Sequence, residues 1–498
     1  MLHAGAESFV HAVRVDNIDS RLEDTGRAFL GAAWDRLLKE RVVPPPDFHP
    51  YPQVGLDYFG GSVSSLAEYR ALEEAIIASH PRFDTGRPLV EREFPAGLIF
   101  SFLETFIARL ARERVEFSLG GPAAEQSLRD LVQAVHADEC EVACCRIVSH
   151  MTTTDSQPVE FAGVRVEPVI SEAADHDRLL LRIISAVIAG ASSAYGRDRP
   201  YDFAPPESVV IARASGSKPF DLAKPLSQRI ERFMLLVQLL QPGTSESMAE
   251  VQGETHTVRQ FKPTVLRFRG AGPGLGSPTA RATRVITLGP DDVVRVDGLG
   301  RLLDAAEQPR NGMIFTSFGM ALQKFQLSFH AYGWSEQVVD LATAFEAALS
   351  GKEKDDVTLR LKTRASTLLS TDLDPAEHIF KDVGVIYGLR STLVHGGAMS
   401  EKSLLKEVRK ISTVPAGLPD RKAVAHVVER LRDLVRRSLL ARICLATGDT
   451  PLWPLGADTG VDAAMVDDFR RKSLREAWRG TLSGIDAVAS ANASSLPG

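Results

Sequence analysis

Five amphipathic segments follow one another between residues 313 and 446, separated by short runs that contain Gly, Pro or Asp. Apolar residues recur in these segments at the spacing of one helix face, which predicts helices. Brief connections favour antiparallel packing of neighbouring helices, as in a helical bundle. The sequence therefore predicts an all-α bundle with helices at 313–331, 335–349, 355–370, 375–397 and 422–446.

The residues before this bundle alternate between two patterns. Runs rich in Val, Ile and Thr predict strands at 140–170, 208–214 and 253–270. Amphipathic runs predict helices at 18–42, 63–79, 96–115, 123–136, 174–190 and 226–241. A further amphipathic run at 461–478 predicts a last helix before a tail of small residues.

These patterns predict an α+β fold class in three parts. A mixed α/β region over 1–290 has a regulatory or sensing role in this interpretation, and a break near residue 137 divides it into two subdomains. The helical bundle occupies 291–450, and a helix and tail occupy 451–498. The run GAGPGLG at 270–276 lacks the Lys-Ser/Thr pair of a phosphate-binding loop, so we interpret it as a connector.

Composition narrows the class of protein. The chain has 498 residues, and this length corresponds to about two to four domains. The net charge of −6 excludes a strongly basic, histone-like protein, and four cysteines cannot form a disulfide framework. The N-terminus lacks the pattern of a signal peptide, and the most apolar run, 179–190, contains Arg182 and is too short for a membrane span. We therefore expect a cytoplasmic protein with no membrane partner.

The segment 378–397 carries the most informative pattern. Its core stripe is formed by apolar residues three and four positions apart, including Ile386, Leu389 and Leu393. Polar side chains lie off that stripe, and two glycines after His395 end the helix. The polar residues are Tyr387, Arg390, Ser391 and His395.

These residues form the pattern R-x4-H, from Arg390 to His395, within Y-x-x-R-S-x-x-V-H-G. The pattern resembles the HEPN superfamily, and its Apea-like branch in particular. The resemblance extends upstream to VVDLATAFEAALSG at 338–351, with Glu346 before a small turn, and to VTLRLKTRASTLL at 357–369. It covers about 300–446. Serine follows Arg390 here, as in many Apea-like members, whereas many active HEPN proteins have Asn, Asp or His at that place.

The resemblance implies a metal-independent endoribonuclease that acts as a homodimer and needs no cofactor. His395 would exchange a proton with the ribose 2′-hydroxyl, and Arg390 would bind the scissile phosphate, with Ser391 beside them and Glu346 and Tyr387 in support. Imidazole suits proton transfer near neutral pH, and guanidinium suits phosphate. The resemblance also implies a trigger-controlled effector of bacterial antiviral defence, a toxin of abortive infection, with a phage-derived or cellular trigger acting on the N-terminal region. Two alternatives stay open: a non-catalytic HEPN module for dimerisation or for nucleotide or RNA binding, and an antitoxin or scaffold.

The segment 401–442 is strongly basic. It contains eleven Lys and Arg against five Asp and Glu, which gives +6 in a chain of −6. Clustered cations attract the phosphates of RNA and make binding salt-dependent. We select as RNA-binding candidates Lys406, Arg409, Lys410, Arg436 and Arg437. The alternative is a solvated helix face.

A cluster of cysteine and histidine side chains invites a zinc interpretation. It spans residues 136–150 and consists of His136, Cys140, Cys144, Cys145 and His150. The spacing does not match the paired ligands of standard structural zinc sites. We therefore expect buried cysteines in a strand and no metal.

Overall fold

The computed structural model describes fifteen segments of the chain, to which all structural statements below refer. They are 4–39, 63–83, 95–113, 118–137, 140–169, 207–216, 219–243, 245–254, 265–266, 285–307, 316–331, 333–349, 356–395, 400–447 and 461–494. The predicted helix at 174–190 and the connector at 270–276 lie outside these segments.

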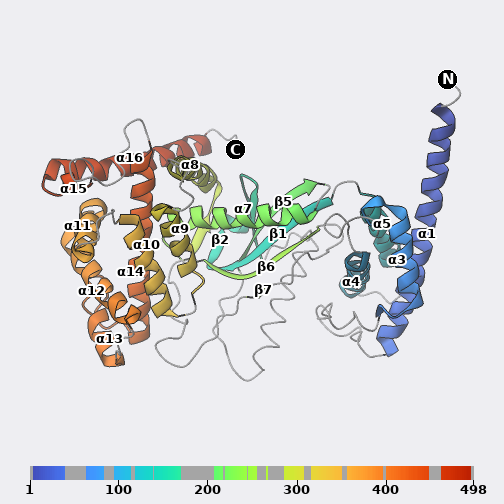
Figure 1. Cartoon of the computed structure of the whole chain (residues 1–498), viewed down its shortest axis with the longest axis horizontal. Coiled ribbons are helices and arrows are strands. Elements are labelled where there is room, and N and C mark those ends of the chain that lie inside the picture. The colour runs from blue at the N-terminus through green and yellow to red at the C-terminus, as the bar shows by residue number, and fades with distance from the viewer. Residues whose placement is uncertain are drawn as a thin grey trace.

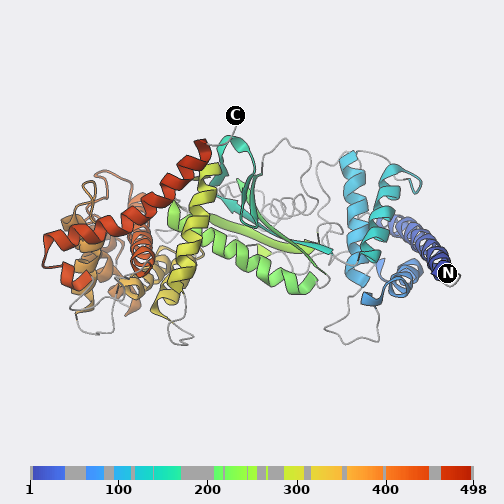
Figure 2. The same cartoon turned by 90° about the horizontal axis from the view of Figure 1, so that it is seen from above.

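Three groups of elements follow one another along an elongated molecule. Figure 1 shows a group of N-terminal helices at one end, a sheet in the middle and a helical bundle at the other end. Figure 2 shows the same order from above, with the bundle and the N-terminal helices on opposite sides of the sheet. The predicted combination of helices and a smaller sheet, an α+β architecture, is present in this order.

The N-terminal group has its own hydrophobic core. It consists of α1 (Ala4–Lys39), α3 (Ala67–Ser79), α4 (Pro95–Glu113) and α5 (Pro122–His136). Phe29 of α1, Phe102 and Phe106 of α4 and Leu128 of α5 are buried together. Pro122 stands at the first turn of α5, where a missing N–H is harmless. These helices occupy the predicted positions, although α1 begins well before residue 18.

The sheet has six strands in the order β3-β4-β5-β1-β6-β7. Its neighbouring strands pair antiparallel, and a separate pair, β2 and β8, is parallel. The strands are β1 (Cys140–Ser149), β2 (Met151–Thr153), β3 (Val159–Phe161), β4 (Val164–Pro168), β5 (Ser208–Gly216), β6 (Glu246–Glu254), β7 (Val265–Leu266) and β8 (Ile286–Leu288). Both faces of the central strand β1 are buried, which explains its nearly continuous apolar sequence.

One long helix, α7 (Pro219–Leu240), lies along a face of the sheet (Figure 2) and packs on β1 and β5. Arg146 of β1 lies on this face, only 2% exposed. Its guanidinium contacts Glu231 of α7 at 2.7 Å and also pairs with Glu250 of β6. This buried ion group therefore connects α7 to two strands.

The C-terminal helices form the bundle. They are α8 (Pro290–Glu307), α9 (Ser317–Ser328), α10 (Trp334–Leu349), α11 (Val357–Leu369), α12 (Ala376–Val394), α13 (Glu401–Val408), α14 (Asp420–Ala446), α15 (Val461–Ala464) and α16 (Asp468–Ser494). The five helices predicted between 313 and 446 are all present; α9, α11 and α12 are shorter than predicted, and α10 and α14 begin one and two residues earlier. Helices α8 and α13 were not predicted, and α16 continues sixteen residues past the predicted end at 478.

The sheet and the bundle share one hydrophobic core. A single buried cluster runs from Val142 of β1, through Phe233 of α7 and Phe345 of α10, to Trp478 of α16. A different cluster holds the N-terminal helices, and the two clusters are separated in sequence between residues 135 and 142. The core therefore continues across residue 290, where the sequence patterns suggested a boundary between domains.

Candidate active site

The R-x4-H pattern lies at the C-terminal end of α12. His395 is the residue that caps this helix, and its backbone N–H donates to the carbonyl of Ser391 at 3.1 Å. Ile386 and Leu389 are buried as the stripe predicts, whereas the side chains of Ser391 and His395 are exposed. The helix end therefore presents an imidazole and a hydroxyl to solvent.

Three side chains meet where α10 and α12 pack together. The Tyr387 hydroxyl donates a hydrogen bond to Glu346 of α10, and Nη2 of Arg390 lies 3.8 Å from the same carboxylate oxygen. The guanidinium carbon of Arg390 is 5.5 Å from the centre of the Tyr387 ring. These contacts bring the predicted supporting residues to Arg390 and orient its side chain.

The electrostatics of this group follow from partial burial. Burial first, and then the hydrogen bond to Glu346, raise the pKa of Tyr387 above its usual range, so the hydroxyl remains a donor at neutral pH. The Arg390 side chain is 25% exposed, and its buried Nε has no hydrogen-bond partner within the described segments. At 3.8 Å, Nη2 and Glu346 attract each other but do not form a hydrogen bond. Arg390 therefore has donor capacity left for an anion.

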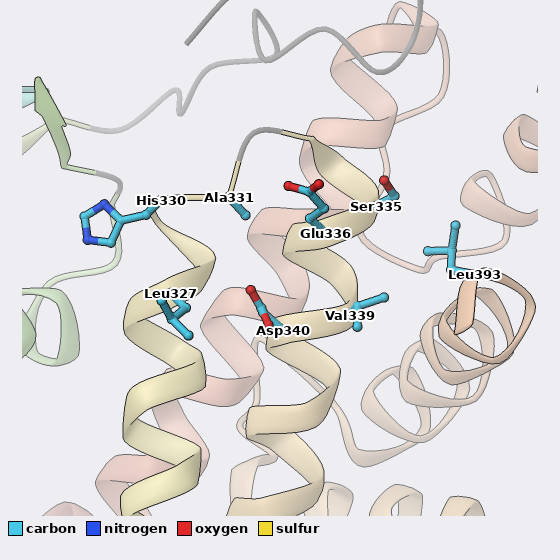
Figure 3. A pocket seen from close by; sticks show the side chains of 8 residues that line it. All are labelled: Leu327, His330, Ala331, Ser335, Glu336, Val339, Asp340 and Leu393. Carbon is cyan, nitrogen blue, oxygen red and sulfur yellow. The ribbon is translucent and has the colours of Figure 1, made fainter. Parts of the chain in front are cut away.

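An open groove of about 550 Å³ lies at the N-terminal end of α10, and its lining residue Val339 precedes Glu346 by about two helical turns (Figure 3). Figure 3 shows α9 on one side, the first turns of α10 in the middle and the end of α12 on the other side. Half of the lining is apolar, namely Leu327, Ala331, Val339 and Leu393. The other half is polar, namely His330, Ser335, Glu336 and Asp340.

The basic segment divides into an exposed part and an internal part. The exposed part is α13 and the turn after it, where Lys402, Lys406, Arg409 and Lys410 face solvent. Arg409 pairs with Asp420 at 3.0 Å, and Lys410 pairs with Glu407 at 2.6 Å. Helix α13 begins six residues after His395 in the chain and contacts α12.

The internal part contains Arg436 and Arg437, whose side chains are only 12% exposed. Arg436 donates to the carbonyl of Leu239 at 3.1 Å and pairs with Asp433 at 2.7 Å. Arg437 donates to the carbonyl of Leu369 at 2.9 Å and pairs with Asp374. These two predicted RNA-binding residues thus connect parts of the fold and offer little surface to a polyanion.

An internal network around Asp374 and Asp382 was not anticipated from the sequence. Arg430 donates twice to Asp374, at 2.8 Å each, and once to the fully buried Asp382 at 3.0 Å. Asp382 also accepts from the backbone N–H and hydroxyl of Ser412. The sequence signal was a pair of acids near α12, but nothing in their spacing identified their partners, which are 30 to 63 residues away.

The structure places the cysteines of the former zinc candidate in or beside the sheet. Cys144 and Cys145 are adjacent on β1 and buried. Within the described segments, no three His, Cys, Asp or Glu side chains are grouped closely enough to hold a metal ion. The described helices also include none that is both long and apolar enough to cross a bilayer.

Comparison of the chain with protein-family models, with curated proteins and with solved structures gave no match. Interpretation of the site therefore depends on its residues and their geometry.

Proposed function

We propose that this protein is a metal-independent endoribonuclease of the HEPN type. The observation that carries the proposal is the arrangement at the end of α12. There, Arg390 is oriented by Glu346 and Tyr387, and the exposed His395 follows at the helix end. A cation that binds phosphate and an imidazole that transfers protons are the two groups that RNA transphosphorylation requires.

In the proposed reaction the substrate supplies its own nucleophile. His395 accepts the proton of a ribose 2′-hydroxyl, and the oxygen attacks the adjacent phosphorus. The bond from phosphorus to the 5′-oxygen breaks, and that oxygen takes up a proton. The products carry a 2′,3′-cyclic phosphate and a 5′-hydroxyl. Arg390 stabilises the charge that develops on the phosphate oxygens, which is the main requirement of phosphoryl transfer.

The exposed cations near His395 in the sequence support an RNA substrate. The exposed cations Lys402, Lys406, Arg409 and Lys410 lie just after His395 in the chain and would attract the backbone on either side of the cut. As in the HEPN proteins that the motif resembles, we expect two copies to bring their R-x4-H motifs together. We further propose that the protein is a cytoplasmic effector of antiviral defence. A trigger that acts on the N-terminal region would release its nuclease activity.

A second candidate function is RNA binding without cleavage. The observation that favours it is the row of exposed cations on α13 and the turn after it, which attracts phosphates whether or not His395 transfers a proton. The two candidates differ in one readout, because only the nuclease produces cyclic-phosphate ends.

The test is RNA cleavage by the purified full chain in EDTA, with product ends identified by mass spectrometry. We expect cleavage by the parent chain and none by His395→Ala or Arg390→Ala. His378→Ala and Lys381→Ala are matched controls, since both residues are exposed on the same helix away from its C-terminal end. Cleavage that persists in both site variants contradicts the proposal, as does cleavage that requires added metal.

A further inference from the structure

The groove at the N-terminal end of α10 continues the seam that holds Arg390. Glu346 of α10 meets Tyr387 of α12, while Val339 of α10 and Leu393 of α12 line the groove. The residue numbers run in opposite directions, so the two helices are antiparallel. Val339 precedes Glu346 by two helical turns, about 10 Å along the helix axis. A single strand of RNA bound at Arg390 can therefore follow the seam between α10 and α12 into the groove.

The volume and lining of the groove fit a small planar ring. Ligand sites in proteins have volumes of about 300–1,000 Å³, with apolar walls and a few polar groups that fix orientation. Here Leu327 of α9 and Leu393 of α12 provide apolar side chains on either side of the first turns of α10, whereas the His330 ring is turned away from the other lining residues (Figure 3). Burial of the apolar faces of a base against side chains of this kind is favourable.

The polar groups of the groove are mainly hydrogen-bond acceptors. Glu336 and Asp340 lie one turn apart on α10, and their carboxylates line the groove. Asp340 is held by Lys324 of α9 at 2.8 Å, which fixes its direction and leaves further lone pairs on its two oxygens. Two carboxylates repel a phosphate, but they accept hydrogen bonds from the exocyclic amino group of a base.

We infer that this groove is a base-recognition site of the proposed ribonuclease and that it selects a base with an exocyclic amino group. Cytosine presents an amino group where uracil presents a carbonyl oxygen, and a carboxylate accepts from the first and repels the second. The inference depends on the proposed function for its substrate class. It adds a specificity that Arg390 and His395 do not provide, because phosphate and ribose are common to all nucleotides.

The test measures binding, so that it does not depend on cleavage. The probes are fluorescently labelled oligocytidylate and oligouridylate of equal length, which differ at the amino or carbonyl group. The full chain carries His395→Ala in every arm to prevent cleavage, and salt is held constant. We expect the cytidylate to bind about tenfold more tightly than the uridylate. Addition of Glu336→Gln and Asp340→Asn should bring the two affinities close together, since an amide offers both a donor and an acceptor.

The control is Glu377→Gln, which removes an exposed acid at the start of α12 and should leave the tenfold ratio unchanged. Equal binding of the two probes by the His395→Ala chain overturns the inference, as does a ratio that survives in the chain with both acids replaced. Failure of the proposed nuclease is seen separately, as absence of cleavage by the parent chain. If the cytidylate binds tenfold more tightly than the uridylate but the parent chain cleaves no RNA, the base-recognition site is supported and the proposed nuclease activity is rejected.

Discussion

The Tyr387 hydroxyl donates a hydrogen bond to Glu346 across the seam between α10 and α12. The same carboxylate lies 3.8 Å from Arg390, so it positions the guanidinium and also reduces the attraction of the guanidinium for a phosphate.

Replacement of Glu346 by Gln should strengthen RNA binding. The amide still accepts from Tyr387, but the negative charge beside Arg390 is lost. Because the pair is partly exposed, we expect the dissociation constant to fall by a factor of about 2 to 5. Fluorescence anisotropy with a labelled RNA at low salt measures the change, and Glu377→Gln corrects for the altered net charge. Weaker binding by the Gln variant is the opposite result and means that positioning by Glu346 matters more than its charge.

The cations of α13 should determine how binding depends on salt. Each phosphate contact on a single strand contributes about 0.7 to the slope of log affinity against log salt. Replacement of both Lys402 and Lys406 by Gln should therefore lower that slope by about 1.4. Arg470→Gln with Lys472→Gln removes two exposed cations from α16 and is the matched control. If both double variants change the slope equally, α13 has no special role in RNA binding.

Asp374 should be essential for the stability of the bundle. Burial opposes its charge, but the hydrogen bonds from Arg430 and Arg437 outweigh burial, and its pKa is lowered below the ordinary 3.8. Asp374→Asn removes the carboxylate that two internal arginines share, although Arg430 keeps Asp382 and Arg437 keeps Asp433, and we expect a loss of about 1–3 kcal/mol in the free energy of unfolding. Urea denaturation at pH 7 measures it. Asp420→Asn is the control, since that acid is exposed in its pair with Arg409.

The lowered pKa of Asp374 also predicts how the stability of the fold changes with pH. A lowered pKa in the folded chain means that the ionised form stabilises the fold above pH 4 and that this stabilisation is lost as pH falls through the folded value. Denaturation midpoints measured between pH 5 and pH 2 should therefore fall more steeply for the parent chain than for Asp374→Asn. Parallel curves would show that other carboxylates control acid unfolding.

Two glycines should respond oppositely to replacement by alanine. A Cβ on Gly298 of α8 would lie 2.9 Å from Cγ2 of Ile485 on α16, so Gly298→Ala should cost about 1–3 kcal/mol. A Cβ on Gly480 of α16 meets nothing within 4 Å, so Gly480→Ala should add about 0.5–1 kcal/mol through helix propensity. Thermal denaturation of the two variants distinguishes the signs. A stabilised Gly298→Ala chain would mean that α8 and α16 separate easily.

Local patterns predicted most helices because their cause is local. The apolar stripe of α12 and the glycines after His395 placed that helix within a few residues of its observed bounds. Helix α13 was not predicted although Ser400 is a good N-cap and accepts from the backbone N–H of Ser403, because the basic run was interpreted through its charge, as an RNA-binding segment or a solvated helix face, and no helix bounds were assigned within it. Helix α16 was predicted too short because its last turns carry small residues without an apolar stripe.

Long-range pairing limited the prediction of the site. Arg436 and Arg437 look like their exposed neighbours in the sequence, and only the fold shows that Asp433 and Asp374 neutralise them inside the bundle. An acidic replacement of either arginine should therefore unfold the chain before it reports on RNA. The groove could not be predicted from the sequence either, since Leu327, Val339 and Leu393 come from three different helices.

The two separate cores affect the order in which the chain can fold during synthesis. The N-terminal helices complete their core once Val135 has been made. The second core begins at Val142 and includes Trp478, so it is complete only 336 residues after it begins. At about 5–20 residues per second this interval is roughly 20–70 s. The elements that pack on β1, namely β5, α7 and β6, are complete by residue 254, whereas the segment from Arg390 to His395 and the last core residue Trp478 follow more than 130 residues later.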